Sequence, residues 1–159
     1  MRVALYNKEK KLLDNRKQQF GMRHFVIAED SSPKGRMYLN GKEIRLRGTN
    51  TMGFLQQNVM RRDWKQLTDD LLLAKLTNMN FIRTTQRIVQ KEVYEYADRL
   101  GMMMQADLPL FAYINQKQYT EILKQAGNIE RVLRNHPSVI LMSYLNEPMA
   151  ERKAHAVSR

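Results

Sequence analysis

The sequence predicts an α/β fold, and three observations lead to that prediction. From residue 44 onward, apolar strand patterns alternate with helical patterns in the order β-α-β-α-β-α-β. The last strand pattern, residues 139–145, is an apolar run broken only by Ser143, which is typical of a strand buried in a parallel sheet. Residues 1–29 contain strand patterns only. The alternation implies right-handed crossovers between parallel strands, in an open doubly wound sheet or in the first half of an eight-stranded barrel.

The N-terminal region is predicted to be β structure. Arg2 to Tyr6 and Phe20 to Ile27 are strand candidates, and the polar residues 7–15 are predicted to be a loop or an exposed hairpin. Two strands cannot build a core of their own. We therefore expect this region to pack on the later elements of the chain or to be the end of a preceding domain, with a boundary in the Ser/Pro/Gly-rich residues 29–35.

A hairpin is predicted around Asn40-Gly41, which lies between two short alternating runs, residues 37–39 and 42–46. Both turn residues tolerate positive φ, as a type I′ turn requires. The second run is expected to continue as a strand into Gly48-Thr49-Asn50.

Three helices are predicted between the later strands. Asp63 with Gln66 three residues later fits an N-cap and a capping box at the start of the first helix. Helical spacing then recurs up to about Asn78 in Leu67, Leu71, Leu72 and Leu76. Gly101 has the position of a helix-ending glycine. The remaining predicted elements are strands at residues 80–84 and 102–107 and helices at residues 93–100 and 119–133.

The composition excludes several classes of protein and of site. Hydrophobic residues make up 43% and charged residues 27% of the 159, as in a folded domain with a core. No apolar run reaches the roughly 18 residues of a membrane span, and the N-terminus lacks the apolar stretch of a signal peptide, so no membrane partner is predicted and the localisation stays open. There is no Cys, which excludes disulfides and thiolate metal sites. The net charge of +11 is spread along the chain rather than concentrated, so nucleic acid ranks last among the partners.

One polar pair follows the last predicted strand, Asn146-Glu147. In parallel α/β folds, chemistry collects at the carboxyl ends of the strands. Pro148 is expected to stop the strand and to bias Glu147 toward an extended backbone. The alternative is that Glu147 is a carboxylate in an ordinary solvated loop. His136 precedes a proline and is expected to cap or pack, and no His/Asp/Glu set has the spacing of a metal site.

Five motifs, in order, resemble those of glycoside hydrolase family 2, the group of β-galactosidases, β-glucuronidases and β-mannosidases. Phe20-Gly21-Met22-Arg23 resembles the FGFR that closes the family's immunoglobulin-like domain, and residues 39–50 resemble LNGKPI-LRGVN at the entry to its barrel. Residues 69–83, 94–101 and 134–147 resemble D-L-x-x-x-K-x-x-N-x-N-x-x-R, fYe-x-cDrlG and RNHPSVI-x-W-S-x-x-NE. The resemblance covers about residues 19–148 and rests on the order of the motifs.

The resemblance implies a partial (β/α)8 TIM barrel, strands one to four, preceded by the terminal strands of an immunoglobulin-like β-sandwich. Residues 1–29 would be the C-terminal strands of the sandwich, and residues 36–159 the N-terminal half of a catalytic barrel. The family hydrolyses β-glycosides with retention, using two carboxyl groups about 5–5.5 Å apart. The implied partner is therefore a carbohydrate, and no cofactor is implied.

The resemblance also implies roles for single residues. Glu147 matches the family's general acid/base, and Asn146 matches the Asn that hydrogen-bonds the sugar's 2-hydroxyl. Arg83 matches the Arg that braces the nucleophile, with a structural ion pair as the alternative. Asp107 and Asn50 are expected to bind substrate, with a helix N-cap and a turn as their alternatives.

Departures from the family's motifs limit these expectations. The family's nucleophile follows strand seven, beyond residue 159, so the chain is expected to be a fragment that is inactive alone. Well-known branches carry a basic residue and His where this chain has Thr51-Met52, and a His where it has Thr85-Gln86-Arg87, which argues against galactosidase or glucuronidase specificity. The alternative function is a non-catalytic binding or self-assembling half-barrel module, because a half barrel exposes two sheet edges.

Overall fold

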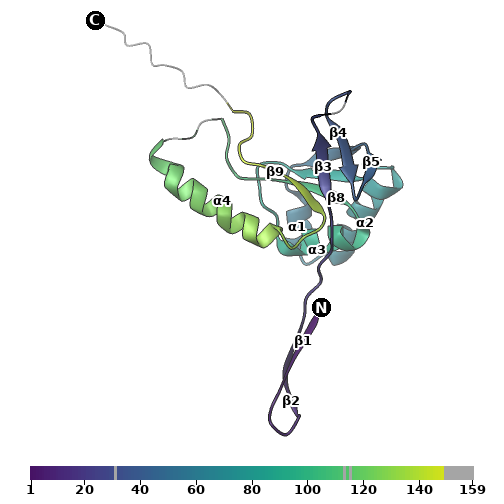
Figure 1. The fold of residues 1–159 in the computed structure, drawn as a ribbon, viewed down its shortest axis with the longest axis vertical. Coiled ribbons are helices and arrows are strands. Elements are labelled where there is room, and N and C mark those ends of the chain that lie inside the picture. Colours follow the sequence, from purple (N-terminus) through teal and green to yellow (C-terminus); the bar gives the residue numbers. More distant parts are fainter. Residues whose placement is uncertain (31, 113, 115, 149–159) are drawn as a thin grey trace, which may run out of the picture.

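The computed structural model describes residues 1–148 except Ser31, Tyr113 and Asn115. Strands β1 (Arg2–Tyr6) and β2 (Leu12–Lys17) form a two-stranded antiparallel hairpin, which extends away from the other elements (Figure 1). The prediction of an exposed hairpin after the first strand is confirmed, whereas the second predicted strand shrinks to β3 (Phe25–Ala28). That these strands belong to an immunoglobulin-like sandwich stays a prediction.

A second sheet crosses the predicted domain boundary. Strand β3 pairs antiparallel with β4 (Arg36–Leu39), which pairs with β5 (Lys42–Ile44). Residues 29–35 therefore connect two paired strands of one sheet, and the division of the chain there stays a prediction. Asn40 and Gly41 have φ of 50° and 80°, which confirms the predicted hairpin turn. The strand expected to continue from β5 to residue 50 is interrupted at residues 45–47.

The third sheet is parallel and has the strand order β6 (Gly48–Thr51), β7 (Phe81–Thr84), β8 (Met103–Asp107), β9 (Val139–Ser143). The predicted parallel crossovers are confirmed. Because neighbours in the sheet are also consecutive in the chain, the described part shows none of the order reversal that marks a doubly wound fold. The order is that of successive strands in a barrel.

The helices agree with most of the predicted ones. Helix α2 (Trp64–Leu76) follows its N-cap Asp63, whose side chain accepts from the Gln66 backbone N–H at 2.9 Å, so the predicted N-cap is confirmed. The Gln66 side chain donates to Asp70 instead of reaching back to Asp63, so the reciprocal half of the predicted capping box is wrong. Helix α3 (Lys91–Leu100) ends at Gly101 with φ of 64°. Helix α4 (Tyr119–Leu133), after the short turn η1 (Gln116–Gln118), has the predicted bounds. Helix α1 (Phe54–Met60) was not predicted.

The core lies between the helices and one face of the parallel sheet. Each of the four α-helices in the described part of the chain contributes to one cluster of buried side chains, which includes Leu55, Leu67, Val93, Tyr94, Met104 and Leu133. The predicted stripe on α2 is half correct, since Leu67 and Leu71 are buried whereas Leu76 is 81% exposed. None of the helices in the described ranges is long and apolar enough to cross a membrane.

The opposite face of the sheet carries a row of polar residues. Side chains alternate between the two faces of a strand, and Ile82 and Thr84 on β7 are buried on the helix side. Arg83 therefore points to the other face. The register places it beside Asn50 of β6 and Gln105 of β8, so three polar residues lie in one row across neighbouring strands.

Candidate functional site

An arginine, a carboxylate and an amide meet at the carboxyl ends of β7 and β8. The Arg83 Nε lies 2.9 Å from Asp107 Oδ2 and 3.2 Å from Oδ1, and one terminal guanidinium nitrogen lies 2.5 Å from Oδ2. The same terminal nitrogen lies 2.5 Å from Asn146 Oδ1. The structure thus brings together three of the five predicted site residues. Asp107 and Asn146 are 24 and 63 positions from Arg83 in the sequence.

Asp107 is fully buried, with 0% of its surface exposed. Besides Arg83, its carboxylate accepts from the Gln105 side chain at 3.0 Å and from the Gln86 backbone N–H at 3.2 Å. These donors satisfy the carboxylate inside the protein. The alternative role as a helix N-cap is wrong, because α4, the next α-helix, begins after Gln118.

The charges at this edge favour the ionised arginine. The hydrogen bond to Asp107 raises the pKa of Arg83 above its ordinary value, against the opposing effect of burial. The negative charges of Asp107 and then Glu147 raise this pKa further. Glu147 directly follows Asn146, whose side chain contacts Arg83.

Asn146 is held by its backbone as well as by its side chain. Its N–H donates to the Leu110 carbonyl at 3.0 Å, and its carbonyl accepts from the Ala112 N–H at 3.1 Å. These bonds form a parallel bridge between Asn146 and Phe111. Strand-like pairing thus resumes beyond the end of β9, and Asn146 is 7% exposed.

Glu147 departs from the predicted backbone. It has φ of 49°, whereas the proline after it was expected to keep it extended, so that expectation is wrong. Both backbone groups of Asn146 are committed to the loop of residues 108–112, and the chain turns directly after that bridge. Positive φ in a non-glycine residue is costly and occurs often at functional sites. The Glu147 side chain is exposed.

Asn50 lies in the same row but at the edge of the sheet. Its Cα is paired with that of Arg83, and the residue is exposed on β6, which has no neighbour on its other side in the described chain. The substrate contacts of Asn50 and of the other candidate residues stay predictions. The alternative of a turn is wrong, because Asn50 is within a strand.

His136 has the predicted packing role. Its Nδ1 lies 2.8 Å from Asp98 Oδ2, and its ring centroid lies 5.3 Å from that of Tyr94. Asp98 also accepts from the Ser138 backbone N–H at 2.9 Å. Burial opposes ionisation of Asp98, but these bonds and the charge of His136 hold its pKa below the ordinary value. The described residues contain no cluster of His, Asp and Glu suited to a metal ion.

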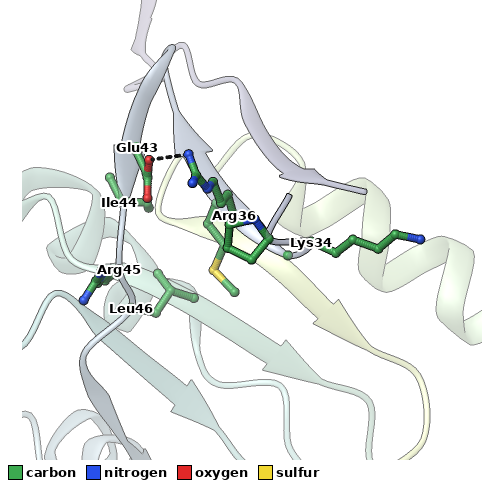
Figure 2. Close-up of a pocket in the computed structure, with 9 residues that line it drawn as sticks. Lys34, Arg36, Glu43, Ile44, Arg45 and Leu46 are labelled. Carbon is green, nitrogen blue, oxygen red and sulfur yellow. Dashed lines mark ion pairs between the residues drawn. The ribbon is translucent and has the colours of Figure 1, made fainter. Parts of the chain in front are cut away.

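A hollow of about 410 Å³ lies away from this cluster. Its lining runs from Pro33 to Met37 and from Glu43 to Leu46, at the amino end of β6. Figure 2 shows Arg36 turned toward Glu43, with a nitrogen–oxygen distance of 3.7 Å, and Lys34 extending away. This hollow is at the end of the strand opposite to the one that carries catalytic groups in barrels, so we do not assign it to the site.

Two groups at the cluster were not anticipated from the sequence, the Gln105 side chain and the Gln86 backbone N–H. The Gln105 contact could have been predicted, because side chains alternate between the two faces of a strand and Gln105 therefore lies on the same face as Asp107. The Gln86 contact could not, because its bond depends on a φ of 56°.

Comparisons with known proteins agree with this geometry. Residues 32–159 match the sequence model of the TIM barrel domain of glycosyl hydrolases family 2. A putative beta-glucuronidase of Formosa agariphila is 30% identical over 155 residues, 92% of this chain and 18% of the relative, and a beta-galactosidase of Thermoanaerobacterium thermosulfurigenes is 27% identical over 138 residues, 80% of this chain and 18% of the relative.

Solved structures give the same result. Beta-glucuronidase 2 of Bacteroides uniformis, covalently bound to cyclophellitol-6-carboxylate aziridine, has a TM-score of 0.72 at 29% identity, covering 92% of this chain and 17% of its own. A beta-D-mannosidase from Dictyoglomus thermophilum shares the fold, with a TM-score of 0.68 at 23% identity over 88% of this chain and 18% of its own. This chain spans less than a fifth of the length of each of these relatives. Since the family model covers most of the sequence, the predicted resemblance is confirmed: the chain belongs to glycoside hydrolase family 2 and contains part of its TIM barrel domain.

Proposed function

We propose that this chain is the acid/base half of the catalytic barrel of a retaining β-glycosidase. The observation that carries the proposal is the bridge from Arg83 to Asp107 and Asn146 at the carboxyl end of the parallel strands, with the exposed Glu147 directly after Asn146. The relatives' named activities concern β-linked sugars, which supports a β-glycoside as substrate.

Glu147 is proposed as the general acid/base. In the first step its carboxylic acid gives a proton to the leaving oxygen, while a second carboxylate attacks the anomeric carbon. In the second step the Glu147 carboxylate takes a proton from the water that releases the sugar. Its exposed side chain is accessible to a substrate approaching the carboxyl edge.

Asn146, Arg83 and Asn50 are proposed to face the substrate at the same edge. Asn146 would bond a sugar hydroxyl next to the reacting carbon, since it immediately precedes Glu147. Arg83 would hold both Asn146 and the incoming second carboxylate, because a guanidinium has five donors and only part of them is used here. Asn50 would reach the sugar from the neighbouring strand.

The second carboxylate is proposed to come from a part of the barrel other than strands β6 to β9. Of the two acids at the described carboxyl edge, Asp107 is buried and satisfied and Glu147 has the other role. Without a nucleophile the covalent step cannot proceed. We therefore expect negligible hydrolysis by the isolated chain.

The test is to complete the barrel. Residues 20–148 would replace the matching segment of the Bacteroides uniformis enzyme, and aryl β-glycosides would be assayed with the chimera, its Glu147→Gln variant and the isolated chain. We expect turnover by the chimera only, with a loss of about 10²–10⁴-fold on substitution of the general acid/base. A folded chimera with equal turnover before and after Glu147→Gln would refute the proposed role, and robust hydrolysis by the isolated chain would refute the half-site.

The alternative proposal, a self-assembling half-barrel module, is favoured by one observation. Strands β6 and β9 are the two edges of the described sheet, and residues 48–50 of β6 are exposed. Unpaired backbone groups on such edges promote pairing with another chain. Light scattering distinguishes the alternatives, since a module of this kind is a dimer at micromolar concentration, whereas a persistent monomer would eliminate it.

A further inference from the structure

The buried carboxylate of Asp107 has no route to a substrate in this structure. None of its surface is exposed, and its two oxygens accept from Arg83, from the Gln105 side chain and from the Gln86 backbone. A sugar hydroxyl could bond Asp107 only after one of these donors left, which would leave a buried donor or part of a charge uncompensated. Its contacts therefore suggest a role inside the protein.

Arg83 links Asp107 to Asn146 through hydrogen bonds to both side chains. The guanidinium is planar and rigid, so an Nε and a terminal nitrogen that are both fixed on Asp107 also fix the direction of the remaining N–H groups. The terminal nitrogen bonded to Asp107 Oδ2 is also the one that reaches Asn146 at 2.5 Å. The orientation of the Asn146 amide thus depends on the Asp107 carboxylate, to which it is linked through Arg83 by two hydrogen bonds.

The orientation of that amide follows from chemistry. A guanidinium has donors and no acceptor, so the atom of Asn146 that faces Arg83 must be the carbonyl oxygen. The amide nitrogen, with its two N–H donors, is then directed elsewhere. No hydrogen bond from this nitrogen occurs among the described residues. Asn146 accordingly presents donors, which suit an oxygen acceptor such as a sugar hydroxyl.

The same carboxylate also fixes the loop after β7. The Gln86 backbone N–H donates to Asp107 Oδ2 at 3.2 Å, and Gln86 has φ of 56°. A non-glycine residue in that conformation needs compensation from its surroundings, and the bond to Asp107 supplies part of it. One buried side chain therefore connects the ends of three neighbouring strands, β7, β8 and, through Arg83, β9.

We propose that Asp107 is a positioning residue that orients Arg83 so that Asn146 offers its amide N–H groups to the substrate, and that Asp107 itself does not touch the sugar. The proposal rests on the proposed function for the identity of the substrate. The orientation of Asn146 is a property of the chain alone and is measurable without turnover.

The experiment uses ¹⁵N NMR spectra of the full chain, with assigned signals of the Arg83 Nε–H, the Gln86 N–H and the Asn146 side-chain amide. In Asp107→Asn, we expect all three signals to shift and the Arg83 Nε proton to exchange with water about tenfold faster or more, the factor expected for a lost charge-assisted hydrogen bond. Asp70→Asn is the matched control, because Asp70 also accepts from two side-chain amides, those of Asn58 and Gln66, at 2.7 Å each.

A second variant keeps the proposal testable if Asp107→Asn does not fold. Arg83→Lys preserves the charge opposite Asp107 but lacks the rigid fork, so we expect the Asn146 amide signals to shift while the Gln86 N–H keeps its position. Asn146 signals that are unchanged in either folded variant would overturn the proposal. None of these NMR measurements is an activity. An inactive chimera would therefore refute the proposed glycosidase function without refuting the positioning role of Asp107, and unchanged Asn146 signals would refute the positioning role without refuting the glycosidase function.

Discussion

The two ends of the parallel sheet are built differently. At the amino end, Asp98 accepts from the Ser138 N–H and lies 2.8 Å from His136 Nδ1, and Arg23 donates to the Val139 carbonyl at 2.8 Å. At the carboxyl end, Glu147 is exposed. In TIM barrels, residues at the amino ends of the strands contribute to stability, and residues at the carboxyl ends carry the catalytic groups.

The backbone shows the same difference. Three non-glycine residues with positive φ follow the carboxyl ends of β7, β8 and β9, namely Gln86, Ala112 and Glu147. At the amino end, positive φ before the strands falls on Asn78 and Gly101, residue types that tolerate it more readily. Glycine also accommodates a close contact there, since a Cβ on Gly48 would lie 1.8 Å from the Phe81 carbonyl oxygen. The positive φ values at the carboxyl end thus fall on residue types that adopt this conformation less readily, a pattern that occurs often at functional sites.

The largest expected effect tests packing at the amino end. Gly48→Ala should destabilise the chain by about 3 kcal/mol or more, because the added methyl group meets backbone rather than a movable side chain. Gly127→Ala on α4 is the control, since its Cβ would meet nothing within 4 Å, and it should be stabilising by about 0.5–1 kcal/mol. Urea denaturation measures both, and a cost below 1 kcal/mol for Gly48→Ala would contradict the close strand contact.

A smaller effect is expected from the buried carboxylate at the amino end. Asp98→Asn should cost about 1–3 kcal/mol near neutral pH, because it weakens the bonds to His136 and Ser138. The folded pKa of Asp98 is lowered, so its contribution is present above the unfolded pKa of about 3.9 and is lost as the pH falls through the lower folded value. The difference in unfolding free energy between the two proteins should therefore shrink below about pH 4; a difference that grows in acid would show that the sign is wrong.

The linking segment before β3 should matter less. Arg23→Met removes the hydrogen bond to the Val139 carbonyl and keeps the aliphatic stem, so we expect a loss of about 1 kcal/mol. Arg2→Met, on the exposed hairpin, is the control and should change stability by less than about 0.5 kcal/mol. Equal effects of the two substitutions would mean that the segment does not support β9.

The smallest effect on stability is expected at the carboxyl end. Glu147→Gln should change the unfolding free energy by less than about 0.5 kcal/mol, because the side chain is exposed and makes no hydrogen bond among the described residues. Thermal denaturation checks this. A cost comparable to that of Asp98→Asn would indicate that Glu147 supports the fold and would remove the contrast between the two ends.

The fold was largely predictable, because its signals are local. The Asn40-Gly41 turn and the Gly101 helix end follow from residues that tolerate positive φ, and the bounds of α4 follow from its apolar spacing. Helix α1 was missed because its seven residues are too few to show a period. The interruption at residues 45–47 was missed because the apolar alternation continues through it.

The site was predictable only as a set of residues. The sequence pointed to Arg83, Asp107 and Asn146 separately, but their hydrogen bonds depend on strand register, which places Arg83 beside β8. The positive φ of Glu147 was not predictable, because it arises from the bridge between Asn146 and a loop more than thirty residues earlier in the chain.

The most direct test of the central claim is chemical rescue of Glu147 in the completed barrel. With Glu147→Ala and an aryl β-glycoside whose leaving group needs no proton, the covalent intermediate should form and then persist, because no base activates water. Azide needs no base, so we expect it to restore turnover and to release a β-glycosyl azide. Asp98→Asn in the same chimera is the control and should show no azide dependence. A Glu147→Ala chimera that is folded, inactive and unresponsive to azide, or one that keeps full activity with unactivated leaving groups, would contradict the assignment of Glu147 as the acid/base.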